Sequence, residues 1–227
     1  MKYLSLFFVV FFVSLSANEE KHSNRSVFSS IYERGEWAND NNGLKSATYE
    51  FTSGSGSSPE NARAYIEFLK DFLVKKKIKS VVDLGCGDWQ ISRVINWEGI
   101  QYTGIDVVDS VVERNTKNYG AKNISFVRAD GIEYLLPEAD LLICKEVFQH
   151  LPIKDVLSIL PQFKKFKYCL ILNDVDPVTL TTTNIDIPRG HYRPLDLTQA
   201  PFSLKGRKVL SYASGMETKQ LLLIENH

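Results

Sequence analysis

The segment from Val81 to Asp88 constrains the fold of this chain more than any other. It reads Val-Val-Asp-Leu-Gly-Cys-Gly-Asp, an apolar run followed by two closely spaced glycines. Apolar and β-branched residues suit a buried parallel strand. Gly85 and Gly87 lack Cβ atoms, so the backbone can adopt positive φ angles and a ligand can lie directly against it. We therefore predict a strand that breaks into a ligand-binding turn, followed by a helix over Trp89 to Ile95.

The residues around this turn indicate what kind of cofactor it suits. A dinucleotide fingerprint has a third glycine or an alanine three residues after the second glycine, whereas position 90 is Gln. Asp88 would also bring a negative charge close to a pyrophosphate. The turn therefore favours a cofactor without phosphates, and an NAD-type oxidoreductase is the alternative.

Two further carboxylates follow predicted strands. Asp106 ends the predicted strand 101–105, 19 residues after Gly87, which is about the sequence spacing at which a second-strand carboxylate meets a ribose diol. Asp130 ends a third run, 124–129, where it can accept a hydrogen bond from the exocyclic amine of a base. Each has a structural alternative, because Asp106 can cap a helix that starts near Asp109 and Asp130 precedes a glycine in a common turn pair.

Together with the segment from Cys144 to Leu151, these motifs resemble those of class I S-adenosylmethionine-dependent methyltransferases. The resemblance covers about Ser80 to Asn173. It implies an α/β, Rossmann-like, doubly wound fold with a mostly parallel seven-stranded sheet whose last strand is antiparallel. The implied cofactor is S-adenosylmethionine. A less specific resemblance, carried by Trp37, the run 54–57 and the run 192–197, is to a sparsely characterised bacterial branch of the same family.

The resemblance also implies roles for individual residues. Gly85 and Gly87 would lie under the methionine and ribose portions of the cofactor. Asp106 would take the ribose hydroxyls and Asp130 the adenine amine. Asp83 would orient the turn and, through water, the amino group of the methionine portion.

Residues 18–58 form a polar N-terminal arm that ends in a Gly/Ser-rich run. One interpretation is a flexible linker. The other is a lid, in which hydroxyls such as that of Ser55 meet the cofactor carboxylate and Trp37 or Tyr49 covers the sulfonium by cation–π attraction. Ser57 and Glu60 have the spacing of a capping box, which predicts that the arm gives way to a helix at Pro59.

Residues 1–17 have the features of a secretory signal: a lysine, an apolar stretch, and small residues at the end. The apolar stretch is short for a membrane span. We expect cleavage after Ser16 or Ala17, a secreted or periplasmic protein, and no integral membrane span in its mature form. An uncleaved membrane anchor is the alternative. Since S-adenosylmethionine is made in cytoplasm, an exported enzyme would act where another source supplies it.

Candidate groups for the acceptor side lie in two segments. His150 ends the run that faces the transferred methyl group in the resembling family, and it is either a general base or a packing residue. Asp174 and His191 are further candidate bases. The long connection 175–207 has no convincing helix and holds Tyr192 and Arg193, which we expect to bind substrate, with Arg193 as an anion clamp or else paired with an aspartate. Bases beside an anion-binding arginine favour O-methylation over N-methylation.

Composition agrees with one enzyme-sized domain over residues 59–227 after the signal and the arm. The chain has 227 residues, and its 27 basic and 27 acidic residues give no net charge, which argues against nucleic acid as a partner. We expect a monomer that acts on a small-molecule or glycan acceptor. The three cysteines are expected to be buried thiols, with no metal site. A secreted protein that binds the cofactor without catalysis is the remaining alternative.

Overall fold

The computed structural model describes residues 23–38, 53–176 and 183–226. The signal segment and Tyr49 lie outside these residues. In the described part of the chain, no helix is both long enough and apolar enough to cross a bilayer.

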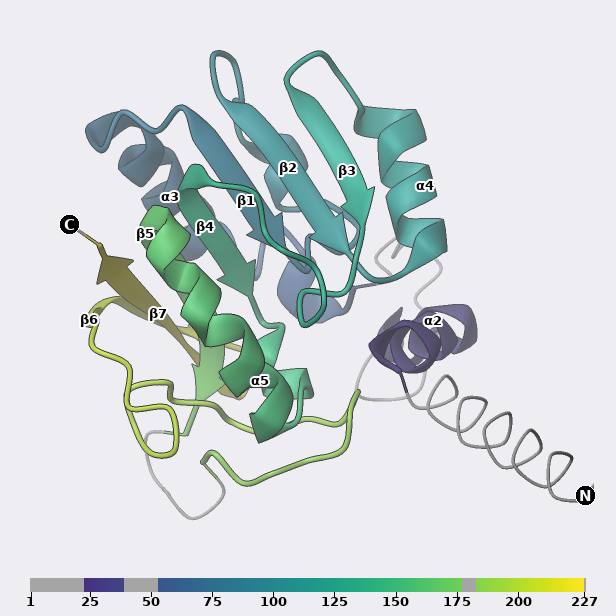
Figure 1. Cartoon of the computed structure of the whole chain (residues 1–227), viewed down its shortest axis with the longest axis vertical. Helices are drawn as coiled ribbons and strands as arrows, with labels where there is room; N and C mark the ends of the chain where they lie inside the picture. The colour runs from purple at the N-terminus through teal and green to yellow at the C-terminus, as the bar shows by residue number, and fades with distance from the viewer. Residues whose placement is uncertain (1–22, 39–52, 177–182, 227) are drawn as a thin grey trace, which may run out of the picture.

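A seven-stranded sheet with the order β3-β2-β1-β4-β5-β7-β6 forms the centre of the molecule (Figure 1). Strands β1 to β5 are parallel, and β7 is antiparallel to both of its neighbours. This confirms the predicted fold class, including the antiparallel last strand. The strands are β1 (Ser80–Leu84), β2 (Gln101–Asp106), β3 (Ile124–Arg128), β4 (Ala139–Lys145), β5 (Phe166–Val175), β6 (Arg207–Ser214) and β7 (Glu217–Glu225).

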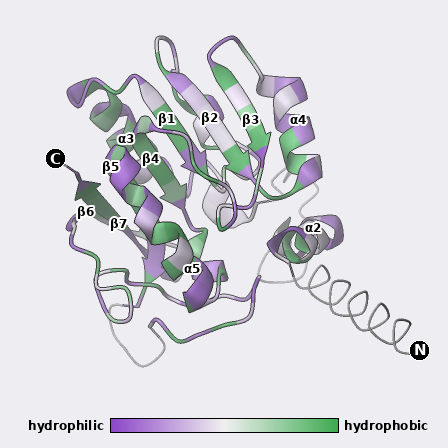
Figure 2. Cartoon of the chain, in the orientation of Figure 1, coloured by the Kyte–Doolittle hydropathy of each residue, from purple (hydrophilic) through white to green (hydrophobic). Residues whose placement is uncertain are grey.

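Helices cover both faces of the sheet, and each face has its own hydrophobic core. Because successive strand residues point to opposite faces, Val81 packs with helix α3 while Val82 packs with helix α5. Hydrophobic residues are concentrated in the central strands (Figure 2). The α-helices are α2 (Asn24–Arg34), α3 (Arg63–Lys75), α4 (Asp109–Tyr119) and α5 (Ile153–Ile159). The 3-10 helices are η1 (Glu36–Ala38), η2 (Ser55–Ser57), η3 (Ser92–Val94), η4 (Phe148–His150) and η5 (Leu160–Lys165).

The helix predicted over Trp89 to Ile95 is wrong, because this segment contains only the short η3. Trp89 has a φ angle of 63°, in the left-handed region that interrupts a right-handed helix. Its ring is buried against Tyr102, Tyr119 and Phe126. Tertiary packing of this aromatic side chain therefore overrides the helical spacing, and the glycine turn does not lead into an α-helix.

The predicted capping box is also wrong. Helix α3 begins at Arg63, and no side chain caps its first turn. Instead, the Ser58 hydroxyl accepts a hydrogen bond from the Asn61 amide at 3.2 Å, which closes a turn ahead of the helix. The Ser57 hydroxyl donates to the Ser53 carbonyl at 3.1 Å. These local hydrogen bonds hold the run 53–58 in turns and delay the start of the helix.

The described part of the polar arm is helical, which contradicts a flexible linker over these residues. Ser23 caps α2, since its hydroxyl accepts from the Ser26 amide, and Gly35 ends it in a left-handed conformation. Phe28 and Ile31 are buried in the α5-side core. Helix α2 lies beyond the carboxyl ends of β2 and β3 (Figure 1), the edge at which α/β sheets bind ligands.

Candidate functional site

A cavity of about 360 Å³ opens at the carboxyl ends of β1, β2 and β4. Its lining comes from the glycine turn, from the ends of five strands, and from both described parts of the arm. We call these two parts, residues 24–38 and 53–57, the lid. Among the predicted site residues, those that line the cavity are Trp37, Ser55, Asp83, Gly85, Gly87, Asp106, Asp130, His150, Asp174 and Tyr192.

The glycine turn has the conformation that the sequence predicts. Gly85 and Gly87 have φ angles of 72° and 54°, and the amides of Gly85 and Cys86 donate to the Ile105 carbonyl at 2.8 and 3.1 Å. A Cβ on Gly85 would lie 2.3 Å from Cγ2 of Val147, and one on Gly87 would lie 2.6 Å from the Ser53 hydroxyl. The bare backbone is therefore required by neighbouring segments as well as by any ligand.

Asp106 holds the turn from the end of β2. Its Oδ2 accepts from the Gly87 amide at 2.9 Å, and its Oδ1 accepts from the Val108 amide at 3.0 Å. Burial raises the pKa of this carboxyl group, although these backbone amides oppose the rise. Since a carboxylate oxygen has two acceptor sites, each oxygen can accept a second donor from the cavity, as a ribose diol requires.

Asp83 is buried and lines the cavity. Its Oδ2 accepts from the Tyr102 hydroxyl at 2.5 Å and from the Ser92 hydroxyl at 3.2 Å. Burial raises the pKa of Asp83 to about 6, against the effect of these two hydrogen bonds. No described residue donates to Oδ1, so this oxygen is available to a cationic or hydrogen-donating ligand.

Asp130 binds the lid as well as its own turn. Its Oδ1 accepts from the Ile132 amide at 3.0 Å and from Nδ2 of Asn24, in α2, at 3.2 Å. The glycine turn is linked to the lid in the same way: the Asp88 amide donates to the Ser53 hydroxyl at 2.8 Å, and that hydroxyl bonds with Tyr32 at 2.7 Å. No signal in the sequence pointed to Asn24, which belongs to no motif, and Ser53 was indicated only as a member of the Gly/Ser-rich run.

Trp37 sits within an aromatic group on the lid side of the cavity. Its ring centroid lies 5.5 Å from that of Tyr32, 5.9 Å from Phe28 and 5.3 Å from His150. All four side chains line the cavity. This wall is apolar and suits a flat or methyl-bearing group beside it.

His150 is fixed in one tautomer. Its Nδ1 lies 3.0 Å from the carbonyl oxygen of His191, and because a carbonyl oxygen can only accept, Nδ1 carries the hydrogen. Burial lowers the pKa of the imidazole, which favours its neutral form. Its Nε2 therefore has a free lone pair, and the ring lies in the cavity wall as a potential proton acceptor.

Asp174 is held by its neighbours at the end of β5. The Gln149 amide group donates to Oδ2 at 3.2 Å, and Lys219 pairs with Oδ1 at 2.5 Å. Burial raises the pKa of Asp174 to about 6 even with this ammonium beside it. Because both of its oxygens are bound, Asp174 serves to position the strand ends rather than to collect a proton from a substrate.

Lys219 also pairs with Glu146 and with Glu217, so its ammonium lies among three carboxylates. These carboxylates are close enough together to hold a metal ion, but the Lys219 ammonium already pairs with all three. Burial raises the pKa of Glu146, yet the ammonium groups of Lys145 and Lys219 outweigh it and lower the value to about 2.

Arg193 is not an anion clamp, which corrects the prediction from the sequence. Its side chain is 1% exposed and does not line the cavity. Its Nη1 donates to the Leu151 carbonyl at 2.7 Å, and its backbone amide donates to the Gln149 carbonyl at 3.2 Å. It pairs with neither Asp174 nor Asp196. Arg193 therefore holds the η4 turn that carries His150.

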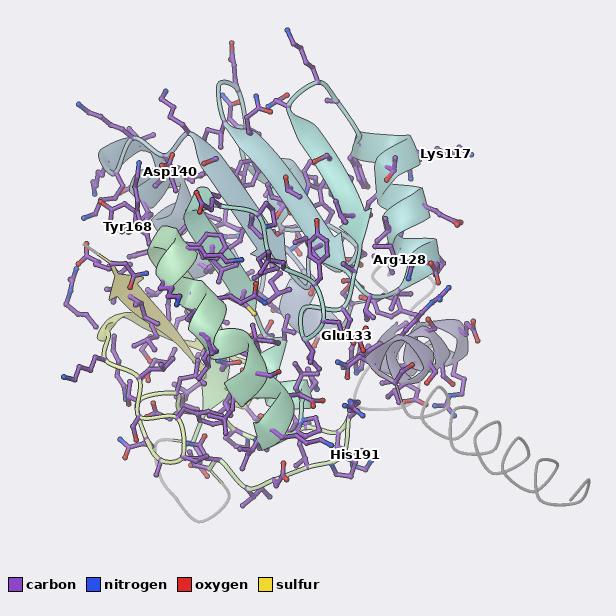
Figure 3. The ribbon with its side chains drawn as sticks, viewed as in Figure 1. Lys117, Arg128, Glu133, Asp140, Tyr168 and His191 are labelled. Carbon is purple, nitrogen blue, oxygen red and sulfur yellow. The ribbon has the colours of Figure 1, made fainter. Side chains whose placement is uncertain are left out.

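His191 does not reach the cavity either, so its imidazole is not placed as a base. It is exposed and lies at the outer edge of the molecule (Figure 3). Its contribution is the backbone carbonyl that binds His150. Tyr192 does line the cavity, beside Asp174, and burial and that carboxylate raise the pKa of its hydroxyl. The three cysteines are free thiols, and Cys144 and Cys169 are buried as predicted, whereas Cys86 is only partly buried.

The cavity fits a cation such as S-adenosylmethionine. Its described lining contains eight acidic side chains and two lysines, and both lysines pair with Glu146. The bare turn, the outward lone pairs of Asp106 and the unpaired oxygen of Asp83 provide acceptors for the hydroxyl and amino groups of the cofactor. No described residue in the lining is an arginine that would bind a phosphate.

Part of the chain is similar to known methyltransferases. Residues 81–166 match the family model of a methyltransferase domain. The chain is 26% identical over 144 residues to the ubiquinone biosynthesis O-methyltransferase of Coxiella burnetii (strain RSA 331 / Henzerling II), a match that covers 54% of this chain and 61% of the relative. The chain thus spans about three fifths of the length of the curated relatives that it matches.

Solved structures agree with the fold. The magnesium protoporphyrin IX methyltransferase of Synechocystis PCC 6803, with bound SAH, superposes with a TM-score of 0.60 at 13% identity, covering 89% of this chain and 98% of the other. The N-methyltransferase NodS of Bradyrhizobium japonicum WM9 gives a TM-score of 0.57 at 16% identity, covering 74% and 97%. At these identities the likeness concerns the fold alone.

Proposed function

We propose that this chain, which carries a class I S-adenosylmethionine-dependent methyltransferase domain, methylates a hydroxyl oxygen of an uncharged small molecule. S-adenosylmethionine is the cofactor of this family. The observation that carries the hydroxyl acceptor is His150, whose fixed tautomer leaves Nε2 unprotonated in the cavity wall. The matched relative from Coxiella burnetii is itself named an O-methyltransferase, which supports the same choice.

The cofactor would be held by the residues of the glycine turn and the strand ends. Gly85 and Gly87 would lie under it, Asp106 would take the ribose hydroxyls, and Asp83 would face the amino group of the methionine portion. Asp130 would accept from the adenine amine. Ser55 and Trp37, on the lid, would close over the carboxylate and the sulfonium.

When bound, the cofactor supplies an already activated methyl group, so the protein mainly positions the acceptor. Such orientation is worth about 7–11 kcal/mol in favourable cases. His150 Nε2 would accept the proton of the acceptor hydroxyl, while the His191 carbonyl and Arg193 keep its ring and its turn in place. The aromatic wall of Phe28, Tyr32 and Trp37 would exclude water from the acceptor.

The acceptor should be uncharged, because the cations near the site are either already paired or outside the cavity. Lys145 and Lys219 both pair with Glu146, and Arg193 lies outside the cavity. No cation in the described lining is therefore available for a phosphate or carboxylate of the acceptor. Among the acceptors expected from the sequence, neutral small molecules and neutral glycans fit these charges, whereas anionic ones do not.

The test is transfer of tritiated methyl from labelled S-adenosylmethionine into fractionated cell extract, with the linkage in the product identified. A methyl ether is expected, and an N-methyl product or a methyl ester would contradict the proposal. His150→Gln should lower turnover by about 10²–10⁴-fold with little change in cofactor affinity. Wild-type turnover should fall as the pH drops through the lowered pKa of His150, because the imidazolium cannot accept a proton.

His191→Gln is the matched control. It retains the backbone carbonyl that binds His150 and alters only a side chain outside the cavity, so turnover should stay close to wild type. Equal losses in the two variants would show that the imidazole of His150 is not the base. Binding of S-adenosylmethionine without any methyl transfer would instead favour a protein that binds the cofactor without catalysis.

We also propose that residues 1–17 direct export, on the strength of their composition alone. Sequencing the N-terminus of the protein purified from its native source tests this. A start at Asn18, or at Ala17, agrees with cleavage by a signal peptidase. A start at Met1 contradicts it.

A further inference from the structure

The lid contains one buried amide whose oxygen has no described partner. Asn24, in the first turn of α2, is 4% exposed and lines the cavity. Its Nδ2 donates to Asp130 Oδ1 at 3.2 Å, whereas its Oδ1 accepts from no described residue. Burying an unpaired amide oxygen costs about 1–3 kcal/mol. Such an atom in a cavity wall marks a place where a ligand can supply the missing donor.

The hydrogen bond to Asp130 fixes which way the amide points. An ionised carboxylate only accepts, so the nitrogen of Asn24 must face it and the oxygen must face away. Although it faces away, the amide oxygen stays close to the Asp130 carboxyl group, because the nitrogen and the oxygen of one amide are only about 2 Å apart. No described residue donates to Oδ2 of Asp130, since its two bonds from Asn24 and Ile132 both go to Oδ1.

Two neighbouring acceptor atoms, Asn24 Oδ1 and Asp130 Oδ2, thus lack donors in the same part of the cavity wall. A single nitrogen that carries two hydrogens can satisfy both, whereas a carbonyl oxygen at that place would face two acceptors. We propose that Asn24 reads the exocyclic amine of the adenine together with Asp130, so that the lid helix itself contributes to cofactor specificity. This inference rests on the proposed use of S-adenosylmethionine.

The position of α2 makes this contact depend on lid closure. Arg25, the next residue, pairs with Asp109 at the start of α4 at 2.7 Å, and this ion pair is largely exposed. Phe28 and Ile31 anchor the middle of the helix in the core. Asn24 is therefore held at the cavity by the contacts of the residues that follow it in α2, and it reaches the cofactor only while the helix is docked.

Isothermal titration with S-adenosylhomocysteine and with its inosine analogue, in which a carbonyl replaces the amine, tests the proposal. The wild-type protein should bind the adenine compound at least about tenfold more tightly, because the analogue leaves both acceptors without donors. Asn24→Ala should weaken binding of the adenine compound by about tenfold and change binding of the analogue much less. The preference between the two ligands is the decisive measurement.

Arg25→Ala is the matched control, because it removes a tether of the same helix without touching the cavity. Any loss of affinity that it causes should be equal for the two ligands. Thermal unfolding of both variants without ligand verifies that they fold. If Asn24→Ala also weakens both ligands equally, Asn24 only docks the helix and the proposal is overturned. If the wild-type protein binds neither ligand, the proposed function fails instead.

Discussion

Replacing Gly85 by alanine tests whether the glycine turn is required by the packing of the protein itself. Gly85 has a φ angle of 72°, and a Cβ there would lie 2.3 Å from Cγ2 of Val147. A side chain at such a φ angle costs about 1–2 kcal/mol. Forcing a methyl group into a packed neighbour costs about 1–3 kcal/mol more. We therefore expect Gly85→Ala to lower the free energy of unfolding by about 2–5 kcal/mol.

Gly99 separates the two contributions. It has nearly the same φ angle, 73°, but a Cβ there would meet nothing within 4 Å. Gly99→Ala should therefore cost only the backbone strain, about 1–2 kcal/mol. The difference between the two variants, about 1–3 kcal/mol, measures the contact with Val147.

Val147→Ala completes the comparison. It removes both methyl groups in the clash and leaves its own Cβ at 3.4 Å from the new methyl group, an ordinary contact distance. The double variant should therefore lose less stability than the sum of the two single variants, by up to about 3 kcal/mol. Urea unfolding followed by circular dichroism supplies all four values. Equal losses at Gly85 and Gly99, or strict additivity with Val147→Ala, would refute the steric explanation.

Three further predictions concern charged groups of the site. Asp106→Asn should weaken S-adenosylmethionine binding by about 1.5–3 kcal/mol in calorimetry, since it removes a charged acceptor, and an unchanged affinity would argue against the ribose contact. Lys219→Met should lower the free energy of unfolding by about 3–5 kcal/mol at pH 8, because it leaves the Asp174 carboxylate buried without its partner. The loss should be smaller at pH 5.5, where Asp174 takes up a proton. A loss of stability that does not depend on pH in urea unfolding would contradict this. The raised pKa of Asp83, about 6, should make affinity for the cationic cofactor rise with pH up to about 6 and then level off, with proton release on binding near pH 6. Calorimetry in two buffers of different ionisation enthalpy measures that release, which Asp83→Asn should abolish.

The central strands could be predicted from the sequence because each is a short run of mainly apolar residues. Such a pattern can be recognised without knowing the rest of the fold. Asp83 and Asp106 follow such runs at the carboxyl edge, so their place in the cavity could also be predicted. The helix expected after the turn was wrong because the ring of Trp89 packs against residues far along the chain. The capping box failed for a different, local reason, since Ser57 and Ser58 form hydrogen bonds within their own turns.

The acceptor side was harder to predict because its residues act through contacts distant in sequence. Arg193 resembles an anion clamp by residue type, yet it is buried against the carbonyl of Leu151. His191 resembles a base, yet it contributes only a carbonyl to His150. Residue type indicates what chemistry a side chain can perform, whereas its neighbours decide whether a ligand can reach it.

By itself, the sequence determined the sheet and the methyltransferase motifs, because strand burial and the glycine turn depend on residues close together along the chain. Only the tertiary structure decided the tautomer of His150, the exclusion of Arg193 from the cavity and the docking of Asn24 beside Asp130. Each of these depends on a hydrogen bond between segments about 40 to 110 residues apart, which local patterns do not encode.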